Sequence, residues 1–382
     1  MRCQRCGNKE LRYFYKDHET WYCRKCIVFG RVNVGELPKR KVYSRKKLPC
    51  SYELKYPLTP SQHRAEADIL NHLQHHQNIL VYAACGAGKT ELVMGAIQMY
   101  LREGKKVGFA ISRRQVVLEI RERMASAFSM LRVIAVCEGF TDVSDGDLII
   151  CTMHQLYRYH QTFDLLIMDE VDAFPYRDNK MLEQIAHHAG IGEIIYLTAT
   201  PSEEMLNDAA QGRLQLIELF QRPHGYPLIV PQVRRGLLFM QMMILLHVLL
   251  VQHRNNVQTL VFVPTIAMAV QLQKYLRFLV RCAAFTSKTK DKEKILEGYH
   301  KQAYEVLICT TILERGITIK GVDVIILHAD HPVFNEASLI QIIGRVGRNI
   351  EIPTGHGWFL CKKQTRDIKR CITALHKMNE SS

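Results

Sequence analysis

A glycine-rich loop that follows a short apolar run is the feature that most constrains the fold of this chain. Residues 79–82 (Ile-Leu-Val-Tyr) are typical of a buried strand, residues 85–90 (Cys-Gly-Ala-Gly-Lys-Thr) form the loop, and residues 91–101 indicate a helix. In such a strand–loop–helix unit the loop backbone N–H groups surround phosphate groups. The loop therefore predicts a parallel α/β sheet with a phosphate site at the carboxyl end of this strand.

The residues of this loop have distinct expected roles. We expect Gly86 and Gly88 to belong to the backbone cradle, Lys89 to reach the outer phosphates, and the Thr90 hydroxyl to bind Mg²⁺. Ala83 stands where the usual pattern has its first glycine. Because backbone N–H groups do most of the binding, the cradle survives this change.

A pair of carboxylates, Asp169 and Glu170, follows the apolar run 165–168 about 80 residues further along the chain. Side chains at the carboxyl end of a parallel strand face the ligand cleft. We expect Asp169 to hold Mg²⁺, directly or through water, and Glu170 to orient and deprotonate the attacking water. The alternative is a pair of exposed carboxylates without a role, which the phosphate loop upstream makes the weaker interpretation.

A cationic segment, residues 341–348, lies about 170 residues beyond the carboxylates. Arg345 and Arg348 are three residues apart on an expected helix and so share one face, with Gln341 one turn earlier at the nucleotide. Arginines from a second lobe can neutralise charge that develops on a γ-phosphate, whereas salt-bridged surface arginines are the alternative. Residues 198–200 (Thr-Ala-Thr), after a strand at 194–197, are expected to sense the nucleotide.

Four cysteines near the start of the chain form two Cys-x-x-Cys pairs separated by 16 residues. This spacing predicts a closed, structural zinc site of four thiolates: Cys3, Cys6, Cys23 and Cys26. Disulfides or an iron–sulfur cluster are the alternatives, and a reducing cytosol disfavours disulfides. The chain leads directly into the first pair, with no signal-peptide pattern, so we expect a cytosolic protein.

Positive charge is concentrated in residues 1–57, which carry 15 Lys and Arg against 5 Asp and Glu, a net +10 of the chain's +14. Such density attracts phosphate polymers or an anionic membrane surface, and clustering favours nucleic acid. The expected phosphate contacts are Lys39, Arg40, Lys41, Arg45, Lys46 and Lys47. Tyr43, Tyr52 and Tyr56 are candidates for base stacking.

From Leu58 onward, short apolar strands alternate with helical stretches, and the same alternation begins again after Pro223. The predicted fold class is α/β, with two RecA-like parallel-sheet lobes preceded by a small zinc-binding module. The apolar run 237–251 is too short to span a bilayer and is expected to be a buried helix. The expected domains are residues 1–27, a four-cysteine zinc module; 28–57, a basic linker; 58–221, lobe 1; and 236–382, lobe 2.

From Leu58 to the C-terminus, the order of these segments resembles the motif order of superfamily 2 helicases. The resemblance implies ATP hydrolysis on a nucleic-acid strand, with ATP and Mg²⁺ as ligands. It also implies that Gln62 recognises adenine, Arg113 and Thr152 hold the strand backbone, Thr310 and Thr311 contact the strand, and Gly316 contacts the nucleotide. Residues 152–156 stand where RNA helicases carry a Pro-Gly-Arg segment, which favours DNA over RNA.

The cysteine module ahead of a basic linker and this motor resembles ComFA-type late competence proteins over the whole chain. The resemblance implies a single-stranded-DNA translocase for uptake of transforming DNA. Its implied partners are the DNA channel and other late competence proteins, and its implied location is the cytoplasm, peripheral at the inner face of the membrane. Whether the protein forms a homo-oligomer stays open.

Two alternatives to a competence translocase remain. One is a primosomal-type replication-restart or repair helicase, although that type carries more zinc ligands, placed between motor segments. The other is a nucleic-acid clamp that binds ATP and hydrolyses it poorly, which Glu170, Arg345 and Arg348 argue against.

Overall fold

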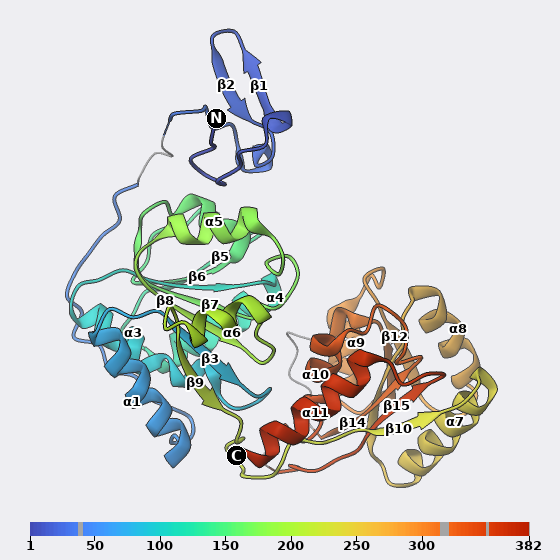
Figure 1. Ribbon diagram of the computed structural model, residues 1–382. Coiled ribbons are helices and arrows are strands. Elements are labelled where there is room, and N and C mark those ends of the chain that lie inside the picture. The colour runs from blue at the N-terminus through green and yellow to red at the C-terminus, as the bar shows by residue number, and fades with distance from the viewer. Residues whose placement is uncertain (37–40, 314–320, 349–350, 382) are drawn as a thin grey trace. The chain divides into compact units, whose positions relative to one another are not determined.

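The computed structural model describes residues 1–36, 41–313, 321–348 and 351–381 (Figure 1). The chain divides into two compact units, one formed by Met1–Ala83 and Gly88–Leu219 and the other by Ala84–Ala87 and Phe220–Ser382. Each unit is built around its own parallel sheet.

The first unit opens with a small cysteine module. Its elements are η1 (Leu11–Tyr13), β1 (Phe14–Asp17), β2 (Thr20–Cys23) and η2 (Ile27–Phe29). The two strands pair antiparallel as a hairpin, with Phe14 opposite Cys23. Phe14 and the four cysteines form the module's own small core.

The main sheet of the first unit has seven parallel strands in the order β5-β6-β4-β7-β8-β3-β9. Their bounds are β3 (Ile79–Ala83), β4 (Val107–Ile111), β5 (Val133–Val136), β6 (Leu148–Thr152), β7 (Phe163–Asp169), β8 (Gly190–Thr198) and β9 (Gln215–Leu219). The helices are α1 (Pro60–Gln74), α2 (Lys89–Leu92), α3 (Met94–Arg102), α4 (Arg114–Ala127), η3 (Met153–Arg158), α5 (Lys180–Ala189) and α6 (Glu203–Ala210).

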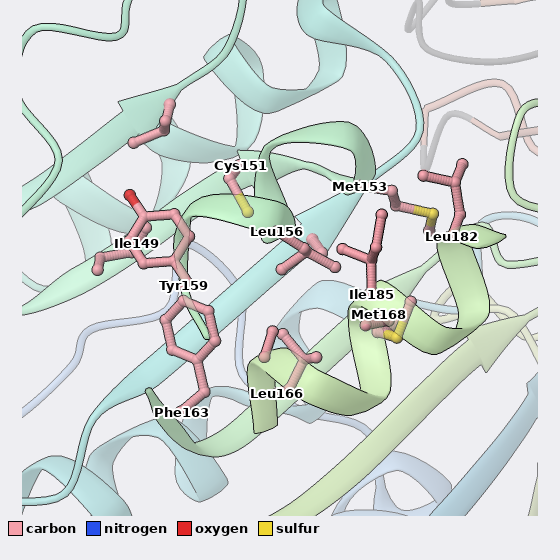
Figure 2. Close-up of a cluster of buried hydrophobic side chains, with 14 of the residues drawn as sticks. Ile149, Cys151, Met153, Leu156, Tyr159, Phe163, Leu166, Met168, Leu182 and Ile185 are labelled. Atoms are coloured by element: carbon pink, nitrogen blue, oxygen red, sulfur yellow. The ribbon is translucent and has the colours of Figure 1, made fainter. Parts of the chain in front are cut away.

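The central strands of this sheet are continuous apolar runs because helices cover both of their faces. All five residues of β4 and of β6 are buried. Figure 2 shows the core on one face, where Leu182 and Ile185 from α5 lie over Leu166 and Met168 from β7. Tyr159 and Phe163 close this core, with ring centroids 5.1 Å apart.

The second unit has a six-stranded parallel sheet in the order β10-β15-β14-β11-β13-β12. Its strands are β10 (Gln232–Arg235), β11 (Gln258–Phe262), β12 (Cys282–Phe285), β13 (Val306–Cys309), β14 (Val322–Leu327) and β15 (Gly357–Cys361). Its helices are α7 (Leu238–Arg254), α8 (Ile266–Leu276), α9 (Lys292–His300), η4 (Thr311–Leu313), α10 (Glu336–Ile343) and α11 (Arg366–Glu380). The two RecA-like parallel sheets confirm the predicted fold class.

The apolar run 237–251 forms α7, as expected, but only one side of this helix is buried. Leu245 and Leu249 pack into the core, whereas Phe239 is 74% exposed and Met243 54% exposed. The expectation of a buried helix was therefore wrong for its outer face, since an all-apolar sequence does not reveal which side packs. Within the described residues, no helix combines the length and apolar character needed to cross a membrane.

Residues 41–57 run along the first unit and are fastened to it at several points. The Tyr43 ring is buried against Tyr159, with centroids 5.4 Å apart, and Arg45 pairs with Asp164 at 2.6 Å. The Tyr52 hydroxyl donates to Glu66 at 2.9 Å. These contacts correct the expectation that Tyr43 and Tyr52 are available to stack on bases, because packing and hydrogen bonding already occupy them.

Candidate functional site

The phosphate loop leaves β3 and enters α2 through two glycines in the left-handed region of backbone space. Gly86 has φ 85° and Gly88 φ 86°, values that residues with a Cβ rarely adopt. A Cβ on Gly88 would also lie 2.4 Å from Nε2 of Gln62. The Lys89 ammonium donates to the Ala83 carbonyl at 3.3 Å, which brings the charge back over the loop. Thr90 follows at the start of α2 and is buried.

Gln62 is fixed beside this loop by the capping box that begins α1. The Thr59 hydroxyl accepts from the Gln62 N–H at 3.3 Å, and Oε1 of Gln62 accepts from the Thr59 N–H at 2.8 Å. The Gln62 side chain is therefore held at the N-terminal end of α1, buried, with its amide nitrogen toward Gly88. The proximity of Gln62 to the loop fits a residue that reads the base of a nucleotide.

Asp169 and Glu170 lie at the carboxyl end of β7. Burial raises the pKa of Asp169 to about 7, the Lys89 ammonium opposes this shift, and the Glu170 carboxylate adds to it. Oδ1 of Asp169 accepts from the Glu170 N–H at 2.8 Å. Oε2 of Glu170 is buried and has no hydrogen-bond partner among the residues that the structure describes.

A buried carboxylate oxygen without a donor calls for a ligand or water to satisfy it. The Thr90 hydroxyl and the two carboxylates also form the oxygen-rich donor set that Mg²⁺ prefers. The residues present therefore fit a nucleotide–magnesium site.

Asp172 connects this site to the end of β8. Its carboxylate accepts from the Thr198 hydroxyl at 2.7 Å and from the Thr200 hydroxyl at 2.5 Å. The Ser112 hydroxyl, at the end of β4, donates to the Glu170 carbonyl at 3.2 Å. No role was predicted for Asp172, although it is the last residue of the Asp-Glu-Val-Asp segment.

The expected strand-contacting residues of the first unit share one edge of the sheet with Asp169. Thr152 ends β6, and Arg113 follows β4 as the N-cap residue of α4. Because β4, β6 and β7 are parallel neighbours, their carboxyl ends meet at the same edge. In the second unit, Thr310 and Thr311 follow β13 in the same sense. Gly316, Lys39 and Arg40 lie outside the described residues.

The expected helix for the two arginines is shorter than the sequence suggested. Gln341 is on α10 and is buried, but α10 ends at Ile343, so Arg345 and Arg348 lie in the turn that follows it. The expectation of one helical face was therefore wrong. The backbone at Gly347 has φ 65°, which a continuing helix does not allow.

Arg222, which lies between the two expected lobes and had no predicted role, holds this turn. Its side chain is 2% exposed and donates to the carbonyls of Val346 at 2.7 Å, of Gly347 at 2.9 Å and of Gly344 at 2.9 Å. Burial lowers the pKa of Arg222 to about 10, and the nearby Arg348 adds to the shift. The guanidinium stays charged at neutral pH and organises the backbone that carries Arg345 and Arg348.

The four cysteines of the N-terminal module meet at one point. All four sulfur atoms lie within 4.8 Å of one another, with Cys3–Cys26 and Cys6–Cys23 each at 3.8 Å. A tetrahedral zinc ion with bonds of about 2.3 Å would give S–S edges of about 3.8 Å. Arg5 donates to the Cys26 sulfur at 3.2 Å, as a supporting contact to a thiolate ligand would. The cluster fits the predicted zinc module.

Family models match both halves of the chain. "Type III restriction enzyme, res subunit" matches residues 55–203, and "Helicase conserved C-terminal domain" matches residues 240–350. The second range lies within the region that resembled the superfamily 2 motif order, and the first begins three residues before that region.

Similar curated proteins carry two different names. Competence protein ComFA of Streptococcus pneumoniae is 33% identical and covers 100% of this chain and 90% of its own length. ComFA of Bacillus subtilis is 30% identical, with 99% and 86% covered. The transcription-repair-coupling factor of Escherichia coli is 26% identical, but the match spans only 30% of that protein.

Two solved structures share the fold. Mss116p bound to single-stranded RNA and AMP-PNP has a TM-score of 0.64 at 16% identity and covers 84% of this chain and 73% of that one. The helicase Lhr of Mycobacterium smegmatis, bound to single-stranded DNA and AMP-PNP, has a TM-score of 0.61 at 16% identity, with 85% and 50% covered. At such low identity these likenesses establish the fold alone.

Proposed function

The chain belongs to the ComFA family and is an ATPase of the superfamily 2 helicase type, and from this premise we propose that it couples ATP hydrolysis to movement along single-stranded DNA during uptake of transforming DNA. The similarity to two competence proteins over nearly the whole chain, cysteine module included, is the observation that carries the proposal.

In the proposed hydrolysis, the loop residues Gly86 and Gly88 hold the phosphates and Lys89 neutralises their outer charge. Glu170 accepts a proton from the attacking water through its buried, unpartnered oxygen. Mg²⁺, held by Thr90 and Asp169, would supply charge stabilisation on the phosphate oxygens. Gln62 reads the adenine edge from its place beside Gly88.

The second unit would supply the cations that complete the reaction. Arg345 and Arg348 neutralise the charge that develops on the γ-phosphate, as arginine fingers do. Gln341 contacts the nucleotide beside them. Arg222 acts as a positioning residue, since three of its four hydrogen bonds fix the turn that carries both arginines, and the fourth goes to the Cys85 carbonyl.

Hydrogen bonds at the sheet edge offer a route from hydrolysis to the strand. Asp172 ties the catalytic segment to Thr198 and Thr200, and Ser112 ties the Glu170 backbone to the segment that begins with Arg113. Arg113 and Thr152, with Thr310 and Thr311 in the second unit, hold the DNA backbone. A shift at Glu170 would therefore move groups that touch the strand.

The competence role also implies partners and a location. We place the protein on the cytoplasmic side of the membrane, peripheral to it, where it receives DNA from the uptake channel together with other late competence proteins. The names of the two ComFA relatives support this role.

Phosphate release, measured with and without oligo(dT), tests the proposal. We expect hydrolysis to rise several-fold with oligo(dT) and to stay low with duplex DNA of the same length. A rate that ignores single-stranded DNA would contradict a translocase. The similarity to a transcription-repair-coupling factor supports a repair motor as the second candidate, and ATP-driven unwinding of duplex DNA would favour it.

A further inference from the structure

The hairpin of the cysteine module presents aromatic rings and cations together on one face. Tyr15 of β1 lies directly opposite Tyr22 of β2, so both side chains project from the same side of the hairpin. We define the tyrosine face as Tyr13, Tyr15, Tyr22 and Arg24. Tyr15 is 45% exposed, and Tyr13 and Tyr22 are partly exposed.

Each ring of the tyrosine face has a cation over it. The Arg24 guanidinium lies 4.2 Å from the Tyr15 ring centroid, and that of Arg31 lies 4.6 Å from the Tyr22 centroid. Tyr13 has the Arg12 guanidinium at 4.9 Å. Aromatic rings and guanidinium planes are the surfaces on which unpaired bases stack.

The charge balance around this face favours a polyanion. Residues 1–31 carry eight Lys and Arg against three Asp and Glu. Glu10 already pairs with Arg12 and Lys25, and Asp17 pairs with Arg31. Arg24 has no carboxylate within ion-pair distance in the part of the chain that the structure describes, so its charge is available to a phosphate.

Building on the proposed function, we propose that the tyrosine face binds single-stranded DNA by stacking bases on Tyr13, Tyr15 and Tyr22 while Arg24 contacts a phosphate. Of the three linker tyrosines that we expected to stack on bases, Tyr43 is buried and Tyr52 is bonded to Glu66, which leaves only Tyr56 exposed, at 59%. The zinc ion would then stabilise a protein surface that binds nucleic acid, and the module would be a DNA-binding part of the motor.

Contacts to the rest of the first unit would let the module transmit a pull. Phe29 stacks on Tyr157 of η3, with centroids 5.0 Å apart and planes at 26°. The Arg5 carbonyl lies 3.1 Å from Nδ1 of His188 on α5. Because η3 follows Thr152 directly, tension on a DNA strand bound by the module would be transmitted to the segment that contains Thr152, a predicted DNA contact.

A bilayer interface is the other partner that tyrosines and arginines fit. The hairpin positions on this face, however, include Asp17 and Thr20 at the tip and no aliphatic side chain. Such a tip favours an aqueous polyanion over a bilayer surface.

Binding of oligo(dT) to the full-length protein tests the proposal. The chain has two tryptophans, so a Trp358→Phe background leaves Trp21 of β2 as a reporter of the module's fold, on the hairpin side opposite the tyrosine face. The anisotropy of labelled oligo(dT) measures binding, and Trp21 emission should stay that of the folded module. In the same background, Tyr15→Ala with Tyr22→Ala should weaken binding by about 5- to 150-fold per ring, the range that stacking of one base contributes.

Matched variants separate stacking from folding. Tyr15→Phe with Tyr22→Phe keeps both rings and should retain the parental affinity, and Tyr275→Ala removes an exposed tyrosine (72%) elsewhere and should have no effect. Arg24→Lys keeps the charge without the planar group and should give an intermediate loss. The zinc content of each variant must equal that of the parent.

Several results would overturn the inference. These are equal affinity in the double alanine variant, an equal loss with duplex DNA, or a tyrosine-dependent association with phosphatidylglycerol vesicles but not with oligo(dT). The stimulation of hydrolysis by DNA distinguishes a failure of this inference from a failure of the proposed function. A parent without stimulation refutes the translocase, whereas a stimulated parent whose double alanine variant needs no more DNA refutes only the role of the hairpin.

Discussion

Two adjacent carboxylates at the end of β7, Asp169 and Glu170, carry the proposed chemistry. Their surroundings in the fold differ. Asp169 is buried, and its pKa is raised to about 7, mainly by burial. Glu170 has a positive φ of 55° and a buried oxygen to which no group in the described part of the chain donates. A non-glycine residue held at positive φ costs about 1–3 kcal/mol, and such residues cluster at functional sites.

The first prediction concerns the proposed general base. Glu170→Gln removes the proton acceptor and keeps the size of the side chain, so ATP binding should persist while hydrolysis falls by about 10²–10⁴-fold. Nucleotide affinity and phosphate release measure the two effects. Glu103→Gln, at an exposed position, is the control and should hydrolyse ATP as the parent does. A Glu170→Gln protein with parental turnover would refute the assignment of the base.

The second prediction concerns the proposed finger. Arg348→Ala should lower the turnover number by about 10³-fold or more, with a smaller effect on nucleotide affinity, because the guanidinium would act on charge that develops during the reaction. Single-turnover measurements separate this step from binding. Arg213→Ala, on the surface of the first unit, serves as the control. Turnover at the parental level would show that Arg348 takes no part in hydrolysis.

The third prediction concerns Arg222, which the sequence did not single out. Arg222→Met removes the donors to four carbonyls, three in this turn and that of Cys85, and each lost bond to a charged group costs about 1.5–3 kcal/mol. We expect lower thermal stability and a loss of turnover that resembles that of Arg348→Ala. Adding Arg348→Ala to Arg222→Met should then lower turnover little further. Fully additive losses would show that Arg222 does not act through this turn.

Motif spacing predicted the residue types of the site but not the hydrogen bonds between them. Lys89, Asp169 and Glu170 follow strand ends that the apolar runs at 79–82 and 165–168 had located. The bond from Thr198 to Asp172 joins residues 26 positions apart, and it depends on β7 and β8 being neighbours in the sheet. Sequence patterns do not determine that order.

At the scale of elements, most strands in the middle of each sheet were predictable, whereas the inner strand β15 and the edge strands were not. The apolar runs at 79–82, 165–168 and 194–197 became parts of β3, β7 and β8, which lie between other strands and are largely buried along these runs. The edge strand β9 alternates exposed residues with buried or partly buried ones, and three of the four residues of the edge strand β10 are exposed, so no continuous apolar run marks either strand. The capping box at Thr59 and Gln62 was present in the sequence, but its link to the phosphate loop required the fold.

The fourth prediction tests this link. Thr59→Ala removes the cap of α1 and should cost about 1 kcal/mol of stability, and it should also weaken ATP binding because Gln62 loses its partner. Ser202→Ala removes the equivalent cap of α6 and is the matched control. The control should show a similar loss of thermal stability and unchanged ATP affinity. Equal ATP affinities in the two variants would show that Gln62 does not contribute to nucleotide binding.

At the scale of the whole molecule, part of the basic segment that the distribution of charge along the sequence predicted is already engaged in contacts with the first unit. Arg45 pairs with Asp164, whereas Lys41, Lys46 and Lys47 are exposed. A cation already held by a carboxylate contributes less to counterion release than one that faces solvent. The described part of the segment therefore contains two classes of cation that binding experiments can tell apart.

The last prediction uses these two classes. Changing Lys41, Lys46 and Lys47 together to Gln should reduce the slope of log affinity for single-stranded DNA against log salt by about 2, from about 0.7 per phosphate contact. Arg45→Gln should change the slope less, because Asp164 already neutralises that guanidinium. Basal hydrolysis should survive in both variants, since none of these residues is in the ATP site. If the triple variant keeps the parental slope but loses association with anionic vesicles or with a partner protein, the segment is a docking surface and the DNA contacts lie elsewhere.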